Sequence, residues 1–216
     1  MTSKLTKHSQ ISDRQRWDLR YREGAYSARY WPAAYLKQLV DAGVIAGTGS
    51  ALDVACGRGR NSLFLADQGY RVDAVDVAPV AIAQGANLAL NLGMRINWQC
   101  RDLAHVRTPF KMRAYSLIVM IRFVAPELFP HLLQGLDADG LLVIEEHMRW
   151  PQTEALVGPT SQRFRVAPGE VLVQLRQTGI EFDVVDQFEG LVKETKDDGT
   201  DGTAAVSRLC IRRRTS

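Results

Sequence analysis

The sequence contains few cysteines and no long hydrophobic run. Its three cysteines, Cys56, Cys100 and Cys210, are far apart and form no C-x-x-C pair. This pattern argues against a disulfide framework and a cysteine-rich zinc site, and it favours a reducing, cytoplasmic environment. The apolar runs, of which residues 117–121 are an example, are much shorter than the ~18 residues that span a bilayer. We therefore expect neither a transmembrane segment nor a membrane partner.

The chain also lacks features that would divide it or mark it for export. The basic segment at residues 1–17 has no apolar stretch of the kind that secretory signals contain. No Ser-, Pro- or Gly-rich linker and no internal repeat interrupts the 216 residues, a length typical of one or two domains. We expect a single domain over residues 1–216, with an N-terminal helical lid or tail at 1–45 and a core at 46–216. Such a domain would be a monomer or a homodimer.

The net charge is small but unevenly distributed. The formal total is +3, from 27 Lys and Arg against 24 Asp and Glu. Residues 1–31 carry a net +4 and residues 208–216 another +4, whereas residues 151–207 carry −5. Blocks of this kind are usually solvated surfaces and only sometimes a nucleic-acid footprint. Nucleic acid is therefore disfavoured as a partner.

Strands and helices alternate from residue 51 onward. Short apolar runs predict strands, and helices are expected between them, with boundaries marked by Gly69, Pro79 and Gly93. The expected strands are residues 51–55, 70–77, 95–100, 115–121 and 141–148, and the expected helices are 61–68, 79–92 and 126–136, with a turn at 137–140. This alternation is typical of βαβ units and of a doubly wound, mostly parallel α/β sheet.

Both ends of the chain depart from this alternation. Residues 12–44 have aromatic and basic side chains at helical spacing and should form helices that pack against or over the sheet. After a loop or partly helical stretch at 150–166, a helix is expected at 168–178. Two strands follow at 180–188 and 204–212, joined by a polar loop that contains glycine. We expect these strands to complete the sheet as an antiparallel hairpin.

The first strand-to-helix turn contains a glycine-rich loop. Residues 53–61 read D-V-A-C-G-R-G-R-N, and such turns bind ligands at the carboxyl ends of the strands of an open α/β sheet. The loop differs from the dinucleotide fingerprint G-x-G-x-x-G because Ser62 occupies the position of the third glycine. Asp53 would repel a pyrophosphate, but it suits a cationic group such as an amine or a sulfonium. The loop thus favours a positively charged nucleoside, and a nicotinamide dehydrogenase is the weakest interpretation.

Three acids lie at the ends of consecutive expected strands. Asp53 is on the first strand, Asp76 ends the second, and Asp102 follows the third. An acid in the place of Asp76 accepts hydrogen bonds from ribose hydroxyls, and Asp102 lies where it can accept one from the exocyclic amine of adenine. Each acid also has a structural alternative, since Asp102 could cap a turn and Asp76 could cap the helix that starts at Pro79. Together the three acids favour a nucleoside site.

The sequence resembles the class I S-adenosylmethionine (SAM)-dependent methyltransferases. The resemblance rests on L-D-V-A-C-G-R-G-R-N-S-L-F-L-A-D-Q-G-Y-R-V-D-A-V-D-V-A-P-V-A-I-A-Q at residues 52–84, on Q-C-R-D-L-A-H-V at 99–106, and on F-x-x-x-x-G-E at 164–170. The sequence looks closely like the tellurite-resistance and thiopurine methyltransferase branch, and the resemblance covers roughly residues 15–212. It implies a Rossmann-like, seven-stranded fold, SAM as cofactor, S-adenosylhomocysteine (SAH) as product, and no metal.

The resemblance also implies which residues bind the cofactor. In such proteins the glycine loop holds the methionine part, the acid after the second strand holds the ribose, and the acid after the third strand reads the adenine. The end of the fourth strand lies near the methyl group, and an N-terminal aromatic helix covers the cofactor. The corresponding residues here are Trp17, Tyr21, Asp53, Ala55, Gly57, Gly59, Asn61, Asp76, Val77, Asp102, Leu103 and Ile121, with Tyr30 or Trp31 near the covering helix.

Three positions depart from the family pattern. Ala55 replaces a usual glycine, Ser116 stands where an acid is frequent, and Ile121 stands where a polar residue is frequent. The N/D-P-P-Y/F motif of amino-methylating enzymes is absent as well. The sequence offers no obvious base near the fourth strand, which favours an acceptor that is already nucleophilic, such as a thiolate or a selenium or tellurium oxyanion.

The acceptor site is expected at the end of the fifth strand, residues 145–150, together with Arg122 and Phe123. Arg122 and His147 are the candidate catalytic residues. His147 could act as a base or be a partly buried histidine bonded to a carboxylate, and Arg122 and Arg149 could bind an anionic acceptor or pair with nearby acids. The leading hypothesis is a SAM-dependent methyltransferase of a small molecule. The alternatives are a SAM-dependent RNA or DNA methyltransferase and a SAM-binding module without turnover.

Overall fold

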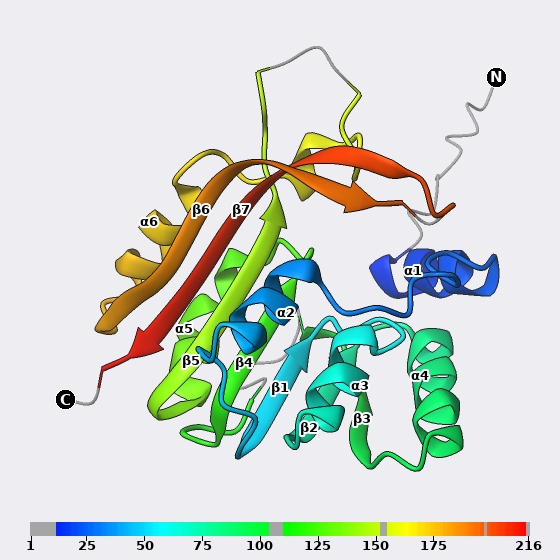
Figure 1. The fold of residues 1–216 in the computed structure, drawn as a ribbon, viewed down its shortest axis with the longest axis horizontal. Helices are drawn as coiled ribbons and strands as arrows, with labels where there is room; N and C mark the ends of the chain where they lie inside the picture. Colours follow the sequence, from blue (N-terminus) through cyan, green and yellow to red (C-terminus); the bar gives the residue numbers. More distant parts are fainter. Residues whose placement is uncertain (1–11, 104–109, 152–154, 197, 215–216) are drawn as a thin grey trace, which may run out of the picture.

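The computed structural model describes residues 12–103, 110–151, 155–196 and 198–214. The described strands form a seven-stranded sheet in the order β3-β2-β1-β4-β5-β7-β6 (Figure 1). The strands are β1 (Ser50–Val54), β2 (Arg71–Asp76), β3 (Ile96–Cys100), β4 (Tyr115–Ile121), β5 (Leu136–His147), β6 (Phe182–Thr195) and β7 (Asp201–Arg213). The pairs among β1 to β5 are parallel, and β7 runs antiparallel to both β5 and β6. The expected Rossmann-like α/β fold with a C-terminal antiparallel hairpin is confirmed.

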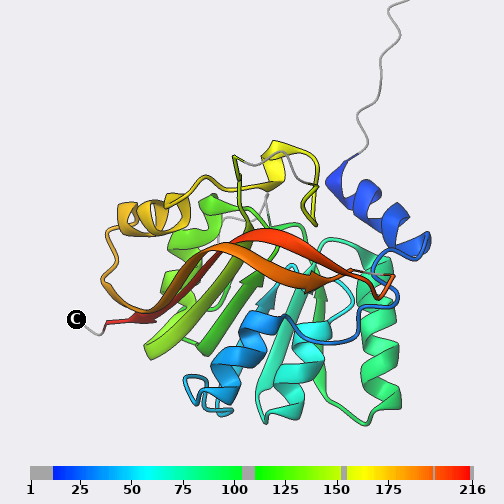
Figure 2. The same ribbon diagram turned by 45° about the horizontal axis from the view of Figure 1, so that its top comes forward.

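Helices cover both faces of the sheet (Figures 1 and 2). The described α-helices are α1 (Asp13–Arg22), α2 (Ala34–Asp41), α3 (Arg60–Asp67), α4 (Pro79–Asn91), α5 (Phe129–Gly135) and α6 (Glu170–Gln177), and short 3-10 turns η2 (Pro126–Leu128) and η3 (Gln162–Phe164) accompany them. None of the described helices is both long and apolar enough to cross a membrane.

The central strand β4 explains why the core lies on both faces of the sheet. Its sequence is almost entirely apolar, as expected for a parallel strand that is buried on both sides. Alternate side chains of a strand point to opposite faces. Leu117 and Val119 therefore join one core cluster with α2 and α3, whereas Ile118 and Met120 join the other with α5 and α6.

The helix α2 packs in this core, although it lies within the segment at residues 1–45 that is expected to be a lid or tail. Tyr35, Leu36 and Leu39 of α2 are almost fully buried and pack in the same cluster as Ala51 of β1. By contrast, α1 buries only Asp18 and Tyr21. We therefore describe α1 and the connecting segment at residues 23–33 as the lid, and we call residues 29–33 of that segment the strap.

The strand β5 begins five residues earlier than expected. The predicted turn at residues 137–140 is a bulge inside this strand, because the pairing with β4 changes from Tyr115–Leu136 to Leu117–Leu141. Asp139 adopts a positive φ of 62° there, and a Cβ atom on Gly140 would lie 2.9 Å from the Tyr115 carbonyl oxygen. The turn residues thus bend the chain as predicted, but they bend it without ending the strand pairing.

Two other boundaries differ from the expectation. The helix α5 starts at Phe129 rather than at Pro126, since Pro130 is favoured in the first turn of a helix and disrupts its interior. The C-terminal hairpin is longer than predicted, because most of the polar segment expected as a loop pairs as strand up to Thr195–Asp201. The hairpin therefore extends past the sheet edge towards α1 (Figures 1 and 2).

Candidate active site

The carboxyl ends of the parallel strands bring the predicted glycine loop and acids to one edge of the sheet. Ala55, Gly57 and Gly59 all have positive φ values, of 56°, 56° and 81°. This left-handed geometry turns the chain sharply from β1 into α3, which has Gly59 as its N-cap. A Cβ atom on Gly59 would collide with the indole ring of Trp98, so no larger side chain fits there.

Asp76 is fixed at the end of β2 by backbone N–H groups. Its two carboxylate oxygens accept hydrogen bonds from the N–H of Gly57 and the N–H of Ala78, each at 2.8 Å. Burial raises the pKa of this carboxyl, and these bonds act in the opposite direction. Each carboxylate oxygen has a second acceptor position. Asp76 therefore both holds the glycine loop and retains capacity for further hydrogen bonds.

Asp53 is almost completely enclosed beneath the loop. Its carboxylate accepts a 2.6 Å hydrogen bond from the Ser62 hydroxyl of α3, and its exposed fraction is 1%. Burial raises its pKa to about 7. Asn61 is also engaged within the chain, since its side-chain oxygen accepts a 2.9 Å hydrogen bond from the Ala33 N–H at the end of the strap. Asp53 therefore links β1 to α3, and Asn61 links α3 to the strap.

The remaining predicted cofactor residues lie at neighbouring strand ends. Val77 is half-buried after β2, Asp102 is exposed after β3, and Leu103 beside it is buried. Ile121 is buried at the end of β4. The parallel register places all these strand ends at the same edge as the glycine loop. The part of the Q-C-R-D-L-A-H-V motif from residue 104 onward lies outside the described residues.

The lid helix α1 covers the loop with aromatic side chains. Tyr21 is buried, and a Cβ atom on Gly57 would lie 2.5 Å from its hydroxyl oxygen. Burial raises the pKa of Tyr21, and the nearby Asp76 charge raises it further. Trp17 is half-buried with its ring centre 6.2 Å from that of Tyr21. Of the two nearby aromatics named from the sequence, Trp31 is half-buried and Tyr30 is 76% exposed.

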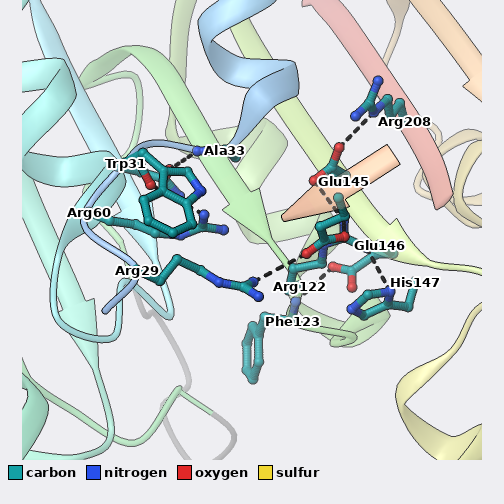
Figure 3. Close-up of polar contacts among 12 residues, drawn as sticks. Arg29, Trp31, Ala33, Arg60, Arg122, Phe123, Glu145, Glu146, His147 and Arg208 are labelled. Atoms are coloured by element: carbon teal, nitrogen blue, oxygen red, sulfur yellow. Dashed lines mark hydrogen bonds and ion pairs between the residues drawn. The ribbon is translucent and has the colours of Figure 1, made fainter. Parts of the chain in front are cut away.

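Four arginines gather where β4 and β5 end, beside the strap and the start of α3 (Figure 3). We call Arg29, Arg60, Arg122 and Arg208 the arginine cluster. Arg122 pairs with Glu194 at 2.7 Å and with Glu145 at 3.2 Å. Three further contacts, Arg29–Glu194 at 3.2 Å, Arg208–Glu145 at 2.6 Å and Arg60 to the Trp31 carbonyl oxygen at 3.4 Å, complete this network.

His147 lies against the same network. Its Nδ1 atom is 2.8 Å from Nη1 of Arg122. Because a guanidinium can only donate, Nδ1 accepts this bond and the imidazole proton is on Nε2. Burial, and then the charges of Arg122, Arg165 and Arg29, lower the pKa of His147 to about 2. The ring is also packed against Gly158, where a Cβ atom would collide with it. His147 is thus neutral, and the lone pair of its Nδ1 atom accepts the hydrogen bond from Arg122.

Glu146 is a second enclosed carboxyl at the end of β5. It accepts a 3.0 Å hydrogen bond from the N–H of Phe123. Burial raises its pKa to about 8, so it is mostly protonated near neutral pH. Arg149, the other cation named from the sequence, has an exposed side chain and lies beyond the strand. The structure therefore brings Arg122 and His147 together and leaves Arg149 at the surface.

Sequence reasoning missed Arg29, Arg60, Glu194 and Arg208. Arg60 directly follows Gly59 in the loop motif, which is the one local signal that could have identified it. The other three are separated from Arg122 by tens of residues or more, and they meet only because the strap and the hairpin reach the same sheet edge. No short sequence pattern encodes such long-range ion pairs.

Two cavities lie elsewhere in the described chain. An open groove of about 900 Å³ is bounded by the first residues of the strands and by α4, including Ser50, Arg71 and Leu90. A smaller cavity of about 220 Å³ lies beside Leu52, Gln99 and Phe110. Neither is lined by a predicted site residue. At the carboxyl edge, by contrast, Tyr21 is packed directly against the glycine loop.

Comparisons with known proteins agree with this geometry. Residues 51–137 match the sequence profile of a family described as a methyltransferase domain. No curated protein matches the chain significantly. Similar solved structures include TehB from Haemophilus influenzae, with a TM-score of 0.68 and 21% identity over 88% of this chain and 66% of the TehB chain. At this level of identity the likeness establishes the fold, and this chain spans slightly less than two thirds of TehB.

Two other solved structures show how varied the proteins of this fold are. The [4+2]-cyclase SpnF has a TM-score of 0.69 and 17% identity, over 94% of this chain and 95% of its own. A SAM-dependent methyltransferase from Methanosarcina mazei has a TM-score of 0.62 and 16% identity, over 86% of this chain and 100% of its own. The fold is therefore common to proteins whose names state different reactions.

Proposed function

We propose that this protein, whose residues 51–137 match a methyltransferase domain, is a SAM-dependent methyltransferase that acts on a small anionic acceptor. The observation that carries the proposal is the Asp76 carboxylate, held by two backbone N–H groups beside a left-handed glycine loop at the carboxyl edge of the sheet. This is the place where open α/β sheets bind nucleosides.

The residues at this edge fit SAM in their donor and acceptor types. Asp76 retains acceptor positions for the two ribose hydroxyls, and the exposed Asp102 can accept a bond from the adenine amine. The loop has no side chain at Gly57 and Gly59, so its backbone can approach a ligand closely. The N-terminus of α3, which has Gly59 as its N-cap, is placed to donate backbone N–H groups to the methionine carboxylate. Asp53 supports the loop through Ser62 rather than from its surface.

The arginine cluster supports an anionic acceptor. Arg29, Arg122 and Arg208 pair with the carboxylates of Glu145 and Glu194, and Arg60 lies near the same charges, so four guanidinium groups surround two carboxylates in these described contacts. Guanidinium groups bind oxyanions and carboxylates through charge-assisted, often bidentate hydrogen bonds. Two kinds of small acceptor can accept such hydrogen bonds: a thiolate that also carries a carboxylate, and a selenium or tellurium oxyanion.

Methyl transfer from SAM is an in-line displacement in which SAM supplies an activated methyl group and leaves as SAH. The chain itself would contribute orientation and exclusion of water, which can be worth up to ~7–11 kcal/mol of a barrier. Arg122 would hold the acceptor, and His147 would position Arg122 through the bond to Nδ1. An anionic nucleophile needs no base, which agrees with the low pKa of His147.

Binding of SAH measured by calorimetry tests the cofactor assignment. We expect the native protein to bind SAH and Asp76→Asn to bind it about 10- to 100-fold more weakly, because hydrogen bonds to a charged group are lost. Asp67→Asn is a matched control, since Asp67 is exposed at the far end of α3. The absence of SAH binding by the native protein would sink the proposal.

An acceptor screen with labelled SAM tests the rest. The panel contains thiols with and without a carboxylate, selenite, tellurite, and RNA and DNA. We expect label on an anionic small molecule. Label only on neutral compounds or on nucleic acid would contradict the anionic acceptor. Because SpnF shares the fold and is named a cyclase, SAH binding without transfer to any acceptor would instead favour a SAM-binding protein without methyl transfer.

A further inference from the structure

Glu194 occupies a position that resembles that of a bound anion. Its carboxylate lies between two guanidinium groups, with Oε1 at 3.2 Å from Arg29 and Oε2 at 2.7 Å from Arg122. These two arginines come from the strap and from the end of β4, and they reach towards each other in Figure 3. Glu194 comes from a third element, because it lies one residue before the end of β6.

The positive charges of Arg29 and Arg122 favour an anion at this position. The side chains of Glu194 and Arg122 are each 16% exposed and that of Arg29 is 12% exposed, so water screens them only in part. Burial lowers the pKa of Arg60, and the nearby charges of Arg29 and Arg122 lower it further, whereas Glu145 and Glu194 oppose the shift. The Glu145 carboxylate is closest to Arg208, at 2.6 Å. Glu194 is therefore a counter-ion of Arg29 and shares Arg122 with Glu145.

We propose that Glu194 is a tethered competitor for the acceptor: its carboxylate holds the anion site formed by Arg29 and Arg122, and an anionic acceptor must displace it to bind. The inference rests on the proposed function for the identity of the displacing ligand. It assigns Glu194 a role in selectivity, because a ligand with weak or diffuse negative charge gains too little from the arginines to replace a carboxylate that is already in place.

The side chain can leave this position without unfolding the strand. The backbone of Glu194 pairs with Gly202 in the β6–β7 hairpin, and this pairing does not depend on where the carboxylate lies. Rotation about the side-chain bonds of glutamate is sufficient to move the carboxylate into solvent. Displacement would then leave Arg29 and Arg122 paired with the incoming anion in place of Glu194.

Sulfate binding by the full-length protein tests the proposal without any acceptor. Sulfate affinity is measured by calorimetry at low ionic strength for the native protein, Glu194→Gln and Asp198→Asn. Asp198 lies in the turn of the same hairpin and bonds to Thr200, so its replacement removes the same charge away from the arginines. We expect Glu194→Gln to bind sulfate about tenfold more tightly than the native protein, as removal of a nearby charge predicts, and Asp198→Asn to match the native protein.

Three results would overturn the proposal: unchanged affinity in Glu194→Gln, an equal gain in Asp198→Asn, or no sulfate binding by Glu194→Gln. If Glu194→Gln does not fold, Glu194→Asp replaces it, because the shorter side chain keeps the charge but reaches the arginines less well. Affinity above that of the native protein is again expected, and no gain overturns the proposal. SAH affinity is measured on the same samples, so a failure of the cofactor assignment is seen separately from a failure at Glu194.

Discussion

Ala55 occupies a loop position at which related sequences usually have glycine. Its backbone conformation in the structure is unfavourable for alanine. Its φ of 56° lies in the left-handed region, which costs an L-residue with a Cβ roughly 1–2 kcal/mol. Glycine adopts this region freely but loses more backbone entropy on folding. The two effects have opposite signs, and the strain is the larger.

We expect Ala55→Gly to raise the free energy of unfolding by about 0.5–1 kcal/mol. Ala66→Gly is the matched control. Ala66 lies in the helix α3, where the same exchange should lower stability by about 1 kcal/mol. Urea denaturation of the three proteins measures both values. Equal destabilisation by the two exchanges would show that Ala55 is not strained.

Two enclosed groups at the end of β5 make stability depend on pH in opposite directions. The pKa of His147 falls from 6.5 to about 2 in the folded protein, so between these values only the unfolded chain binds the proton. The pKa of Glu146 rises from 4.5 to about 8, so between these values only the folded protein binds it. By linkage, the His147 contribution is lost as pH falls below about 6.5, and the Glu146 contribution is lost as pH rises from 4.5 towards 8.

We therefore expect His147→Gln to flatten the acid side of the stability profile and Glu146→Gln to flatten the alkaline side. Unfolding free energies measured from pH 4 to pH 9 test this, on the native protein and both variants. The Glu146→Gln variant should lose less stability than the native protein between pH 6 and pH 9. Parallel profiles for all three proteins would show that neither group has the stated pKa.

At the scale of elements, the helix α4 takes its N-terminal cap from the lid. Its own N-cap residue, Ala78, makes no side-chain hydrogen bond. Asp18 of α1 accepts a 2.9 Å hydrogen bond from the N–H of Val80 in the first turn of α4 and also pairs with Arg22 at 2.6 Å. A carboxylate at a helix N-terminus is favoured both as a cap and by the helix dipole. The same contact fixes α1 over the glycine loop.

We expect Asp18→Ala to lower the free energy of unfolding by about 1 kcal/mol and to increase amide hydrogen exchange in α1. The control is Asp41→Ala, because Asp41 forms an exposed pair with Lys37 within one helix, and such pairs contribute little. Hydrogen exchange followed by mass spectrometry separates a local loosening of α1 from a general loss of stability. Unchanged exchange in α1 would mean that other contacts dock the lid.

At the scale of the whole molecule, three of the four arginines at the basic C-terminus have partners within the chain. Arg208 pairs with Glu145 at 2.6 Å, Arg213 donates to the Leu136 carbonyl oxygen at 2.6 Å, and Arg214 donates to Asp183 at 2.9 Å. Arg212 is exposed. A nucleic-acid footprint would need such cations to face phosphates. Because residues 208–213 form about half of β7, a single substitution tests this alternative better than a deletion of the C-terminus.

We expect labelled RNA to bind the native protein only weakly, with a dissociation constant no lower than about 0.1 mM, the weak end of the range of non-specific binding near physiological salt. Arg212→Gln should change this little. Fluorescence anisotropy at two salt concentrations measures it. Micromolar, salt-dependent binding that Arg212→Gln abolishes would favour the nucleic-acid methyltransferase instead.

Local sequence patterns predicted much of the fold but little of the proposed acceptor side. The strand order is that of a repeated βαβ unit, so apolar runs and their glycine or proline boundaries were sufficient to place β1 to β4 within one residue. The glycine loop and Asp76 were likewise found from their spacing, since the first two strands place both at one edge. The hairpin was longer than expected, because its polar segment pairs as strand, whereas the helices expected at residues 12–44 include α2, which packs against the sheet.

The sequence by itself determined the α/β architecture, the turn at Ala55 to Gly59 and the acid at Asp76, because these depend on short-range backbone preferences and on strand order. Only the tertiary structure decided the surroundings of Arg122. Its partners Glu145, His147 and Glu194 lie 23, 25 and 72 residues away, and their protonation depends on burial that no local pattern encodes. The proposed cofactor side of the site thus followed from local sequence, whereas the proposed acceptor side depends on long-range contacts made on folding.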